Sequence, residues 1–268
     1  MAKAKTKIED NTEEEALLSK LNGRDNSKSD VSMPFLAMNI ASEDDEGNEI
    51  PVKTFHLSGT KLYSKTIRFR PLAFKNKLIT MKQQGKDWKT LNETIFYNVG
   101  EQPLDARGGI ACGRLLGKAV PDHWNEAEVK VNKAKATFYG FLFGLVEFPG
   151  EKPVLCNFRV PGGKAVQIGT VLRDLADNHE GFARYMLNLK LASNPKDKSS
   201  PHPILEIEPD MSTVLPVSGI KDHLNSILEF VDTHNKRIRD SHASVKLARQ
   251  ETKEDSALLD DLDDNIPF

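Results

Sequence analysis

Basic and aromatic side chains are interleaved along residues 61–89, in a pattern that could bind a polyanion. Lysine and arginine attract phosphates, and aromatic rings stack on nucleobases of any sequence, so together they can hold a single nucleic-acid strand. The candidate side chains are Lys61, Tyr63, Lys65, Arg68, Arg70, Phe74, Lys75, Lys77, Lys82, Lys86, Trp88 and Lys89. Arg107 and Arg114 extend the set, because they flank glycines that would let the backbone approach a ligand or simply form tight turns.

The strand predicted at residues 63–74 carries basic residues on both of its faces. Successive side chains of a strand point to opposite faces, so Lys65 and Arg68 lie on different sides. Because an unpaired cation is costly to bury, we expect this strand at the surface and not at the centre of a sheet. We expect the residues after it to form a basic loop. The alternative is an ordinary amphipathic strand with a solvated basic face.

The C-terminal residues 260–268 join an acidic run to an apolar tip. Such a short segment has too little surface to fold alone, so its chemistry suits capture by a partner. Aspartates would steer it to a basic surface, while Phe268 would fill an apolar pocket. The candidate partner-binding residues are Asp261, Asp263, Asp264, Ile266, Pro267 and Phe268. A solubilising acidic end is the alternative, although such an end has no use for Phe268.

These residues resemble the C-terminal tip of bacterial single-stranded DNA-binding proteins, which end in an acidic run followed by Ile-Pro-Phe. Asn265 stands where that family usually has an acid, and Leu262 where an aromatic residue is common. The whole chain is similar in layout to the larger single-stranded DNA-binding proteins of bacteriophages. That resemblance implies an elaborated OB-fold core, a helical segment and an acidic tail. It implies single-stranded DNA and proteins of replication, recombination or repair as partners.

The charges are segregated along the chain, although the net charge is only −2. Residues 1–50 hold 6 of the 37 basic and 12 of the 39 acidic residues, and residues 251–268 hold 1 and 7. Residues 51–250 therefore carry a net charge of +10. A basic body between acidic ends fits a polyanionic partner.

The sequence does not predict a catalytic or metal site. It has no carboxylate pair in an apolar setting and no Ser/His/Asp arrangement, and Cys112 and Cys156 lack metal-binding spacing. We therefore expect a protein that is not an enzyme and needs no cofactor. Two cysteines fit a reducing cytosol. Without an apolar secretory signal or membrane span, we expect a cytoplasmic protein, in a bacterial host if a phage encodes it.

Hydrophobic patterns predict a mainly β (α+β) fold. Strands are expected at residues 33–40, 52–57, 63–74, 133–148, 154–160, 185–191 and 204–207, and a short helix around residues 168–175. The strand at 133–148 is apolar on both faces, so we expect it at the centre of the sheet. The Gly/Pro turns and the internal helix suit a small barrel with helical decorations, the OB-fold, and a β-sandwich is the rival.

Four segments are predicted along the chain. Residues 1–32 form a mobile segment, 33–217 an OB-fold-like DNA-binding core, 218–250 an amphipathic helix, and 251–268 an acidic protein-recruiting tail. The helix would pack on the barrel or pair with another chain, which would give a homo-oligomer. The alternative function is an interaction protein whose tail engages host replication proteins while the body is no dedicated DNA binder.

Overall fold

The computed structural model describes most of the residues from Met33 to Asp263, all within one compact unit. The described residues are 33–43, 47–84, 87–113, 136–179, 181–195, 197, 200 and 202–263. For residues 82–84, 87, 88 and 251–263 the description covers the backbone. The segment predicted to be mobile, residues 1–32, lies outside the described residues.

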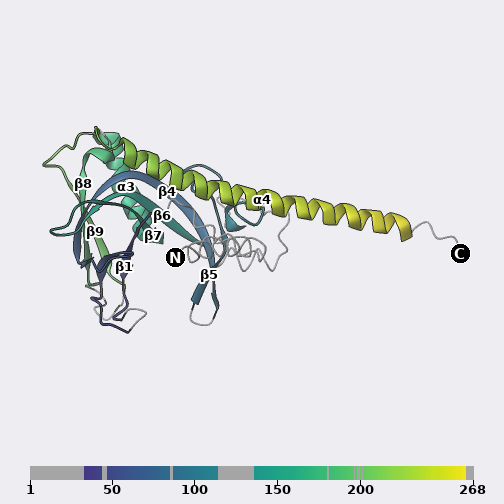
Figure 1. Ribbon diagram of the computed structural model, residues 1–268, viewed down its shortest axis with the longest axis horizontal. Helices are drawn as coiled ribbons and strands as arrows, with labels where there is room; N and C mark the ends of the chain where they lie inside the picture. The colour runs from purple at the N-terminus through teal and green to yellow at the C-terminus, as the bar shows by residue number, and fades with distance from the viewer. Residues whose placement is uncertain are drawn as a thin grey trace, which may run out of the picture. The chain divides into compact units, whose positions relative to one another are not determined.

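Among the described residues, nine strands form one curled sheet with the shape of a half-barrel (Figure 1). The strands are β1 (Phe35–Asn39), β2 (Thr54–Leu57), β3 (Tyr63–Ser64), β4 (Thr66–Gln84), β5 (Asp87–Glu93), β6 (Ala136–Glu147), β7 (Val154–Pro161), β8 (Met186–Ala192) and β9 (Ile204–Asp210). Their order is β3-β2-β1-β7-β6-β4-β8-β9, and β5 pairs with β4. A β-sandwich needs two sheets, so that alternative is wrong for the described strands.

The central strands follow a Greek-key path. β4, β6 and β7 are successive antiparallel neighbours in the sheet, and β8 returns through a helix to pair with the first part of β4. Their spatial order is thus β8-β4-β6-β7, with the fourth strand beside the first. Ahead of this unit in the chain, β1 joins the sheet by pairing in parallel with β7 and carries β2 and β3 with it.

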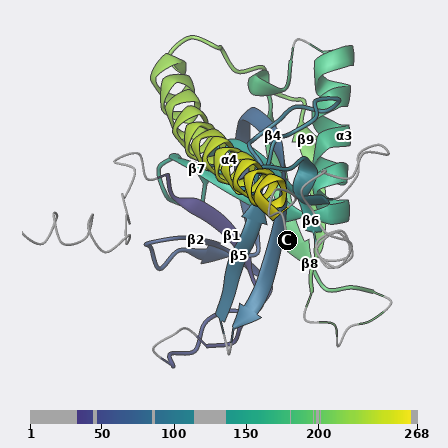
Figure 2. The same ribbon diagram turned by 90° about the vertical axis from the view of Figure 1, so that its right-hand side faces the viewer.

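Two α-helices of the described chain lie on opposite sides of the sheet (Figure 2). Helix α3 (Gly162–Asn178) follows β7 and buries Ala165, Ile168, Leu172 and Leu175 against the inner face of the curled sheet. The helix predicted around residues 168–175 is therefore confirmed and begins earlier. Short 3₁₀ turns stand at Ala111–Gly113 and Phe182–Arg184.

Helix α4 (Lys221–Asp263) crosses the outer face of the sheet and continues past it (Figure 1). Ile227 and Val231 pack with Phe143 in an outer core, as expected for an amphipathic helix that docks on the sheet. The side-chain amide of Asn235 also bonds both backbone groups of Phe96, with its Oδ1 2.6 Å from the Phe96 nitrogen. The helix extends beyond the predicted end at residue 250, because good helix formers continue there without Gly or Pro.

The strand β4 is central, so the expectation that this basic strand lies at the surface is wrong. It spans 19 residues and pairs with β6, with β8 and with β5. Residues 75–84 continue the strand and do not form a basic loop. The sheet tolerates these basic side chains because each buried one has a partner. The partly buried Arg70 donates to the carbonyls of Ala183 and Pro216. The buried Lys77 has an acidic partner.

The buried partner of Lys77 is Glu93 on β5. Lys77 is only 3% exposed, and its Nζ donates to Glu93 Oε2 and to His234 Nε2 on α4, the latter at 2.6 Å. Burial lowers the pKa of Lys77, while the Glu93 carboxylate opposes that shift. Burial and the nearby Lys77 charge lower the pKa of His234 to about 3, so its imidazole stays neutral and can accept a hydrogen bond from Lys77. Arg237 binds the second oxygen of Glu93.

Replacing Lys77 with Met should lower the free energy of unfolding by about 3 kcal/mol, near the lower end for breaking a buried ion pair. The loss stays at that end because Arg237 still faces Glu93. Urea denaturation at pH 7 measures it. The exposed Lys65 provides the control, since Lys65→Met should change stability by less than about 0.5 kcal/mol. Equal stabilities of the two variants would contradict the proposed role of the buried pair.

Candidate nucleic-acid interface

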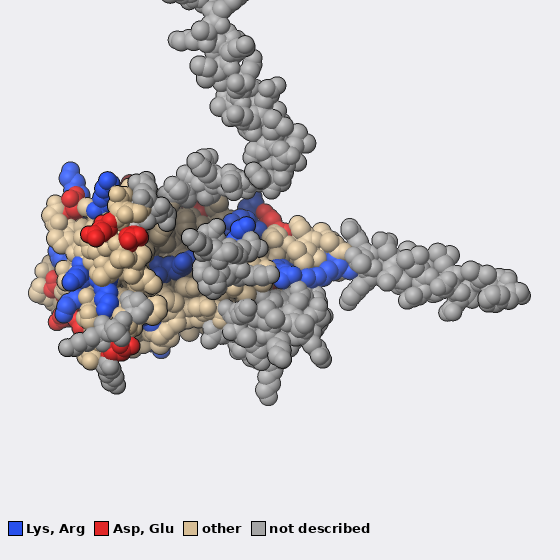
Figure 3. All heavy atoms as spheres, turned by 90° about the horizontal axis from the view of Figure 1, so that it is seen from below, with Lys and Arg blue, Asp and Glu red and all other residues tan. Residues whose placement is uncertain are grey.

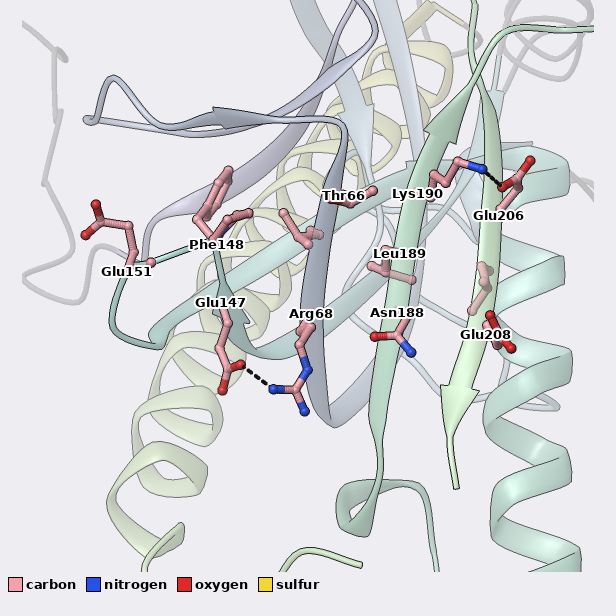
Figure 4. Close-up of a pocket in the computed structure, with 14 residues that line it drawn as sticks. Thr66, Arg68, Glu147, Phe148, Glu151, Asn188, Leu189, Lys190, Glu206 and Glu208 are labelled. Atoms are coloured by element: carbon pink, nitrogen blue, oxygen red, sulfur yellow. Dashed lines mark hydrogen bonds and ion pairs between the residues drawn. The ribbon is translucent and has the colours of Figure 1, made fainter. Parts of the chain in front are cut away.

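Arg68 lines a hollow of about 900 Å³ between β4, the β6–β7 turn, β8 and β9 (Figure 4). Its guanidinium lies 3.2 Å from Glu147 Oε2 and 3.7 Å from Asp210 Oδ2. The hollow is also lined by Glu151, Glu206 and Glu208, and Lys190 pairs with Glu206 at 2.8 Å. Carboxylates outnumber cations here, so a phosphate bound to Arg68 would have to displace them. Arg68 therefore does not belong to the candidate interface.

Lys61 and Tyr63 lie at the β3 edge of the sheet. Lys65 connects β3 to the start of β4, where its carbonyl accepts a 2.9 Å bond from the Leu191 nitrogen of β8. Lys61 and Lys65 are exposed, and neither forms an ion pair with another described residue. The half-buried Tyr63 ring stacks on His56 of β2, with 4.5 Å between ring centroids and 7° between planes. His56 is held by a 3.0 Å contact from its Nε2 to the Thr60 carbonyl. This edge offers open cations around a preformed aromatic stack.

Phe74 packs inside the protein, so its ring is not a site for base stacking. Its ring lies against Gly140 so closely that a Cβ at Gly140 would be 2.7 Å from it, and it also reaches Gly169 of α3. Phe74 packs against the inner core. The neighbouring Lys75 is half-buried and donates to Asn98 Oδ1 at 2.7 Å, a neutral partner that leaves its charge available.

The remaining predicted residues divide between structural positions and undescribed ones. Lys77 and Arg70 are committed to the contacts described above, so they do not belong to an open interface. Lys89 is exposed on β5, while Arg107 is half-buried beside α4, where its carbonyl accepts a bond from Arg249 at 3.1 Å. The side chains of Lys82 and Trp88, and all of Lys86 and Arg114, lie outside the described residues.

The glycine-rich connection around Arg107 folds around a buried acid. The carboxylate of Asp105, which is fully buried, accepts bonds from the backbone nitrogens of Arg107, Gly109 and Cys112, each at 3.0 Å. Gly108 adopts a positive φ of 76°, as a tight turn requires. With a carboxylate already in this nest of amides, the loop does not offer those amides to a phosphate.

No metal-binding group of three or more His, Cys, Asp or Glu side chains occurs among the described residues. Cys112 and Cys156 are both free and buried, and burial raises the pKa of each thiol above its usual value. Within the same residues, no helix combines the length and apolar character that a membrane span needs. For the acidic tip, the backbone at Asp261 and Asp263 belongs to the end of α4, whereas Asp264, Ile266, Pro267 and Phe268 lie outside the description.

The sequence pattern did not single out His56, Arg159, Tyr139 or Phe35, which share the outer face. Arg159 is exposed on β7, and its guanidinium carbon lies 5.2 Å from the centroid of the Tyr139 ring on β6. The four residues come from four different strands, so their position on a common face has no signature in local spacing. Lys and Arg side chains are spread over this side of the body and along the described part of α4 (Figure 3).

Comparison with known protein families, curated proteins and solved structures finds no match to this chain.

Two of the three aromatic candidates in the basic stretch, Tyr63 and Phe74, should behave differently on substitution. Tyr63→Ala should weaken binding of single-stranded DNA by about 1–3 kcal/mol, the range for a stacked base, and leave the thermal midpoint nearly unchanged. Phe74→Ala should instead destabilise the fold by about 3–5 kcal/mol, because its ring fills the inner core. Fluorescence titration and thermal melts of both variants test this. A Tyr63 variant that melts early but binds normally would assign Tyr63 to the core.

Proposed function

We propose that this protein binds single-stranded DNA on the outer face of its curled sheet and recruits partner proteins through its C-terminal tip. The observation that carries the proposal is the open group of Lys61, Lys65 and the Tyr63–His56 stack. These cations have no carboxylate partner among the described residues, and the half-buried Tyr63, which stacks on His56, lies between them in the sequence. Cations that bind phosphates and rings that stack on bases are the two components of sequence-tolerant single-strand binding.

The path of the strands supports an OB-fold-like core as the finer description of the fold. The OB-fold is a five-stranded, partly open Greek-key barrel. β4, β6, β7, β8 and β9 follow such a path, with α3 inserted between β7 and β8. β1, β2 and β3 would then be an addition to the barrel, joined to it along β7.

The C-terminal pattern supports the second half of the proposal. An acidic run that ends in Ile266, Pro267 and Phe268 fits capture by a basic, apolar pocket on proteins of DNA replication, recombination or repair. In a phage-encoded protein, those partners would belong to the bacterial host and the protein would act in the host cytoplasm.

A second candidate is an interaction protein whose body is a scaffold for the tail. The observation in its favour is that Arg68, Arg70 and Lys77 are committed to internal contacts. Fewer cations are therefore open than the basic composition suggests. The two candidates differ in the affinity of the body for single-stranded DNA.

Titration of the intact protein against single-stranded and duplex DNA at several salt concentrations tests the DNA-binding half. We expect a preference for the single strand and a steep loss of affinity with salt. Lys61, Lys65 and Arg159 are exposed cations, and the half-buried Lys75 has a neutral partner. Contact of these four side chains with phosphates, at about 0.7 per neutralised phosphate, gives a log–log slope of about 3. A flat slope, or equal affinity for duplex DNA, would favour the scaffold.

Deletion of residues 260–268 and the single substitution Phe268→Ala test the tail. The deletion removes four aspartates that can compete for the basic body, so DNA should bind more tightly at low salt. Phe268→Ala keeps those charges, so it should leave DNA affinity unchanged and abolish capture by host replication proteins. Calorimetry of tail peptides against such a protein measures capture. A Phe268→Ala peptide that binds as well as its parent would reduce the tail to a solubilising end.

A further inference from the structure

Arg159 and Tyr139 form a cation–aromatic pair on the outer face, away from the predicted basic stretch. The pair joins β7 to β6 with 5.2 Å between the guanidinium carbon and the ring centroid. Arg159 is exposed and has no ion pair with a described residue, whereas Arg68, Lys190 and Arg237 each bind a carboxylate. Tyr139 is half-buried and packs against the outer core, so part of its ring is exposed. A guanidinium held over a ring can bind a phosphate, and the exposed part of the ring can contact a base.

The sheet register places this pair on the same face as β1. Phe35 lies opposite Asn157 in the parallel β1–β7 pairing. Because side chains alternate along a strand, Ala37 and Arg159, each two residues further on, project from the same face as Phe35 and Asn157. The intervening partners, Leu36 and Phe158, are both buried in the inner core.

The same face continues through β2 to β3. Ala37 lies opposite His56, and His56 lies opposite Tyr63. Ala37 is small, so no large side chain from β1 separates Arg159 from the His56–Tyr63 stack at this level of the sheet. Phe35, which is 53% exposed, stands beside it on β1.

Tyr63, His56, Ala37 and Arg159 thus form a row of outer-face residues that runs across the strands. On the β6 side of Arg159, this row becomes covered. Phe141 lies opposite Arg159 and is buried under Phe96, with 4.9 Å between ring centroids. Lys75 follows opposite Phe141 and remains half-buried. The accessible part of the row therefore ends at Arg159 on one side and at Tyr63 with His56 on the other. Tyr139 lies diagonally from Arg159, opposite Pro161 and two residues along β6 from Phe141, and its ring contacts the guanidinium.

We infer that a single DNA strand crosses the sheet along this row and stacks bases at two separate stations. This inference rests on the proposed function. The first station is Tyr63 with His56, and the second is Tyr139 with Arg159, with the guanidinium binding the intervening phosphate. β3 and β7 are three strands apart, or about 14 Å at the usual strand spacing, so the two stations take different bases. The nucleic-acid path thus runs across the strands and joins the β1–β3 addition to the central Greek key.

Anisotropy titration of labelled oligothymidine tests the second station with Tyr139→Leu and Arg159→Gln. Tyr139→Leu should weaken binding about 5- to 150-fold, the equivalent of one stacked base. This loss should disappear on an oligomer of abasic deoxyribose phosphates, which has nothing to stack. Arg159→Gln should weaken binding to both oligomers and reduce the log–log salt slope by about 0.7, the contribution of one phosphate.

The matched control is Arg173→Gln, which removes an exposed arginine from α3 on the opposite side of the sheet. It should leave both affinity and slope as in the parent protein. If the parent binds single-stranded DNA while Arg159→Gln and Tyr139→Leu behave like this control, the second station is wrong and the proposed function stands. If the parent itself does not bind, the proposed function fails. Arg159 is exposed, so its variant remains decisive even if Tyr139→Leu unfolds.

Discussion

The contact of Lys77 with Glu93 holds together the three elements on which the outer face depends. Lys77 is on β4, Glu93 is on β5, and His234 and Arg237 bring α4 to the same point. An unpaired charge at this depth would be costly, so the pair requires β4, β5 and α4 to meet in one arrangement. Phe96 packs beside Lys77, and Asn235 of α4 bonds the backbone of Phe96. The contact between α4 and the sheet therefore continues along the helix.

The meeting point of β4, β5 and α4 at Lys77 and Glu93 divides the outer face into parts with different chemistry. α4 covers the strands around Phe141 and Phe143 with an apolar core. Toward β8 and β9, carboxylates surround Arg68 and make the surface unsuitable for phosphates. Toward β1, β2 and β3, cations and rings remain open. Charge balance within the sheet, more than the total number of basic residues, therefore decides where a polyanion can bind.

Much of the secondary structure could be predicted from the sequence. The alternating apolar residues of β6, β7 and β8, and the apolar stripe of α3, depend on neighbours close in the chain. Tyr63, Lys61 and Lys65 could be recognised as surface candidates for the same reason. The central position of β6 also followed from its two apolar faces, because a strand that is apolar on both sides must be covered on both sides.

The local sequence pattern could not show which basic side chains are paired with an acidic or polar partner inside the protein. Glu93 is 16 residues from Lys77 in the chain, and His234 is 157 residues away, so only the pairing of β4 with β5 and the docking of α4 bring them together. The same limit hid the row from Tyr139 and Arg159 to His56 and Tyr63, which depends on the register of five strands. The sequence by itself determined most of the strands, the presence of both helices and the supply of charge, whereas the second half of β4 and the whole of β5 were not predicted. The tertiary structure decided which charges face solvent, because burial and pairing depend on residues far apart in the chain.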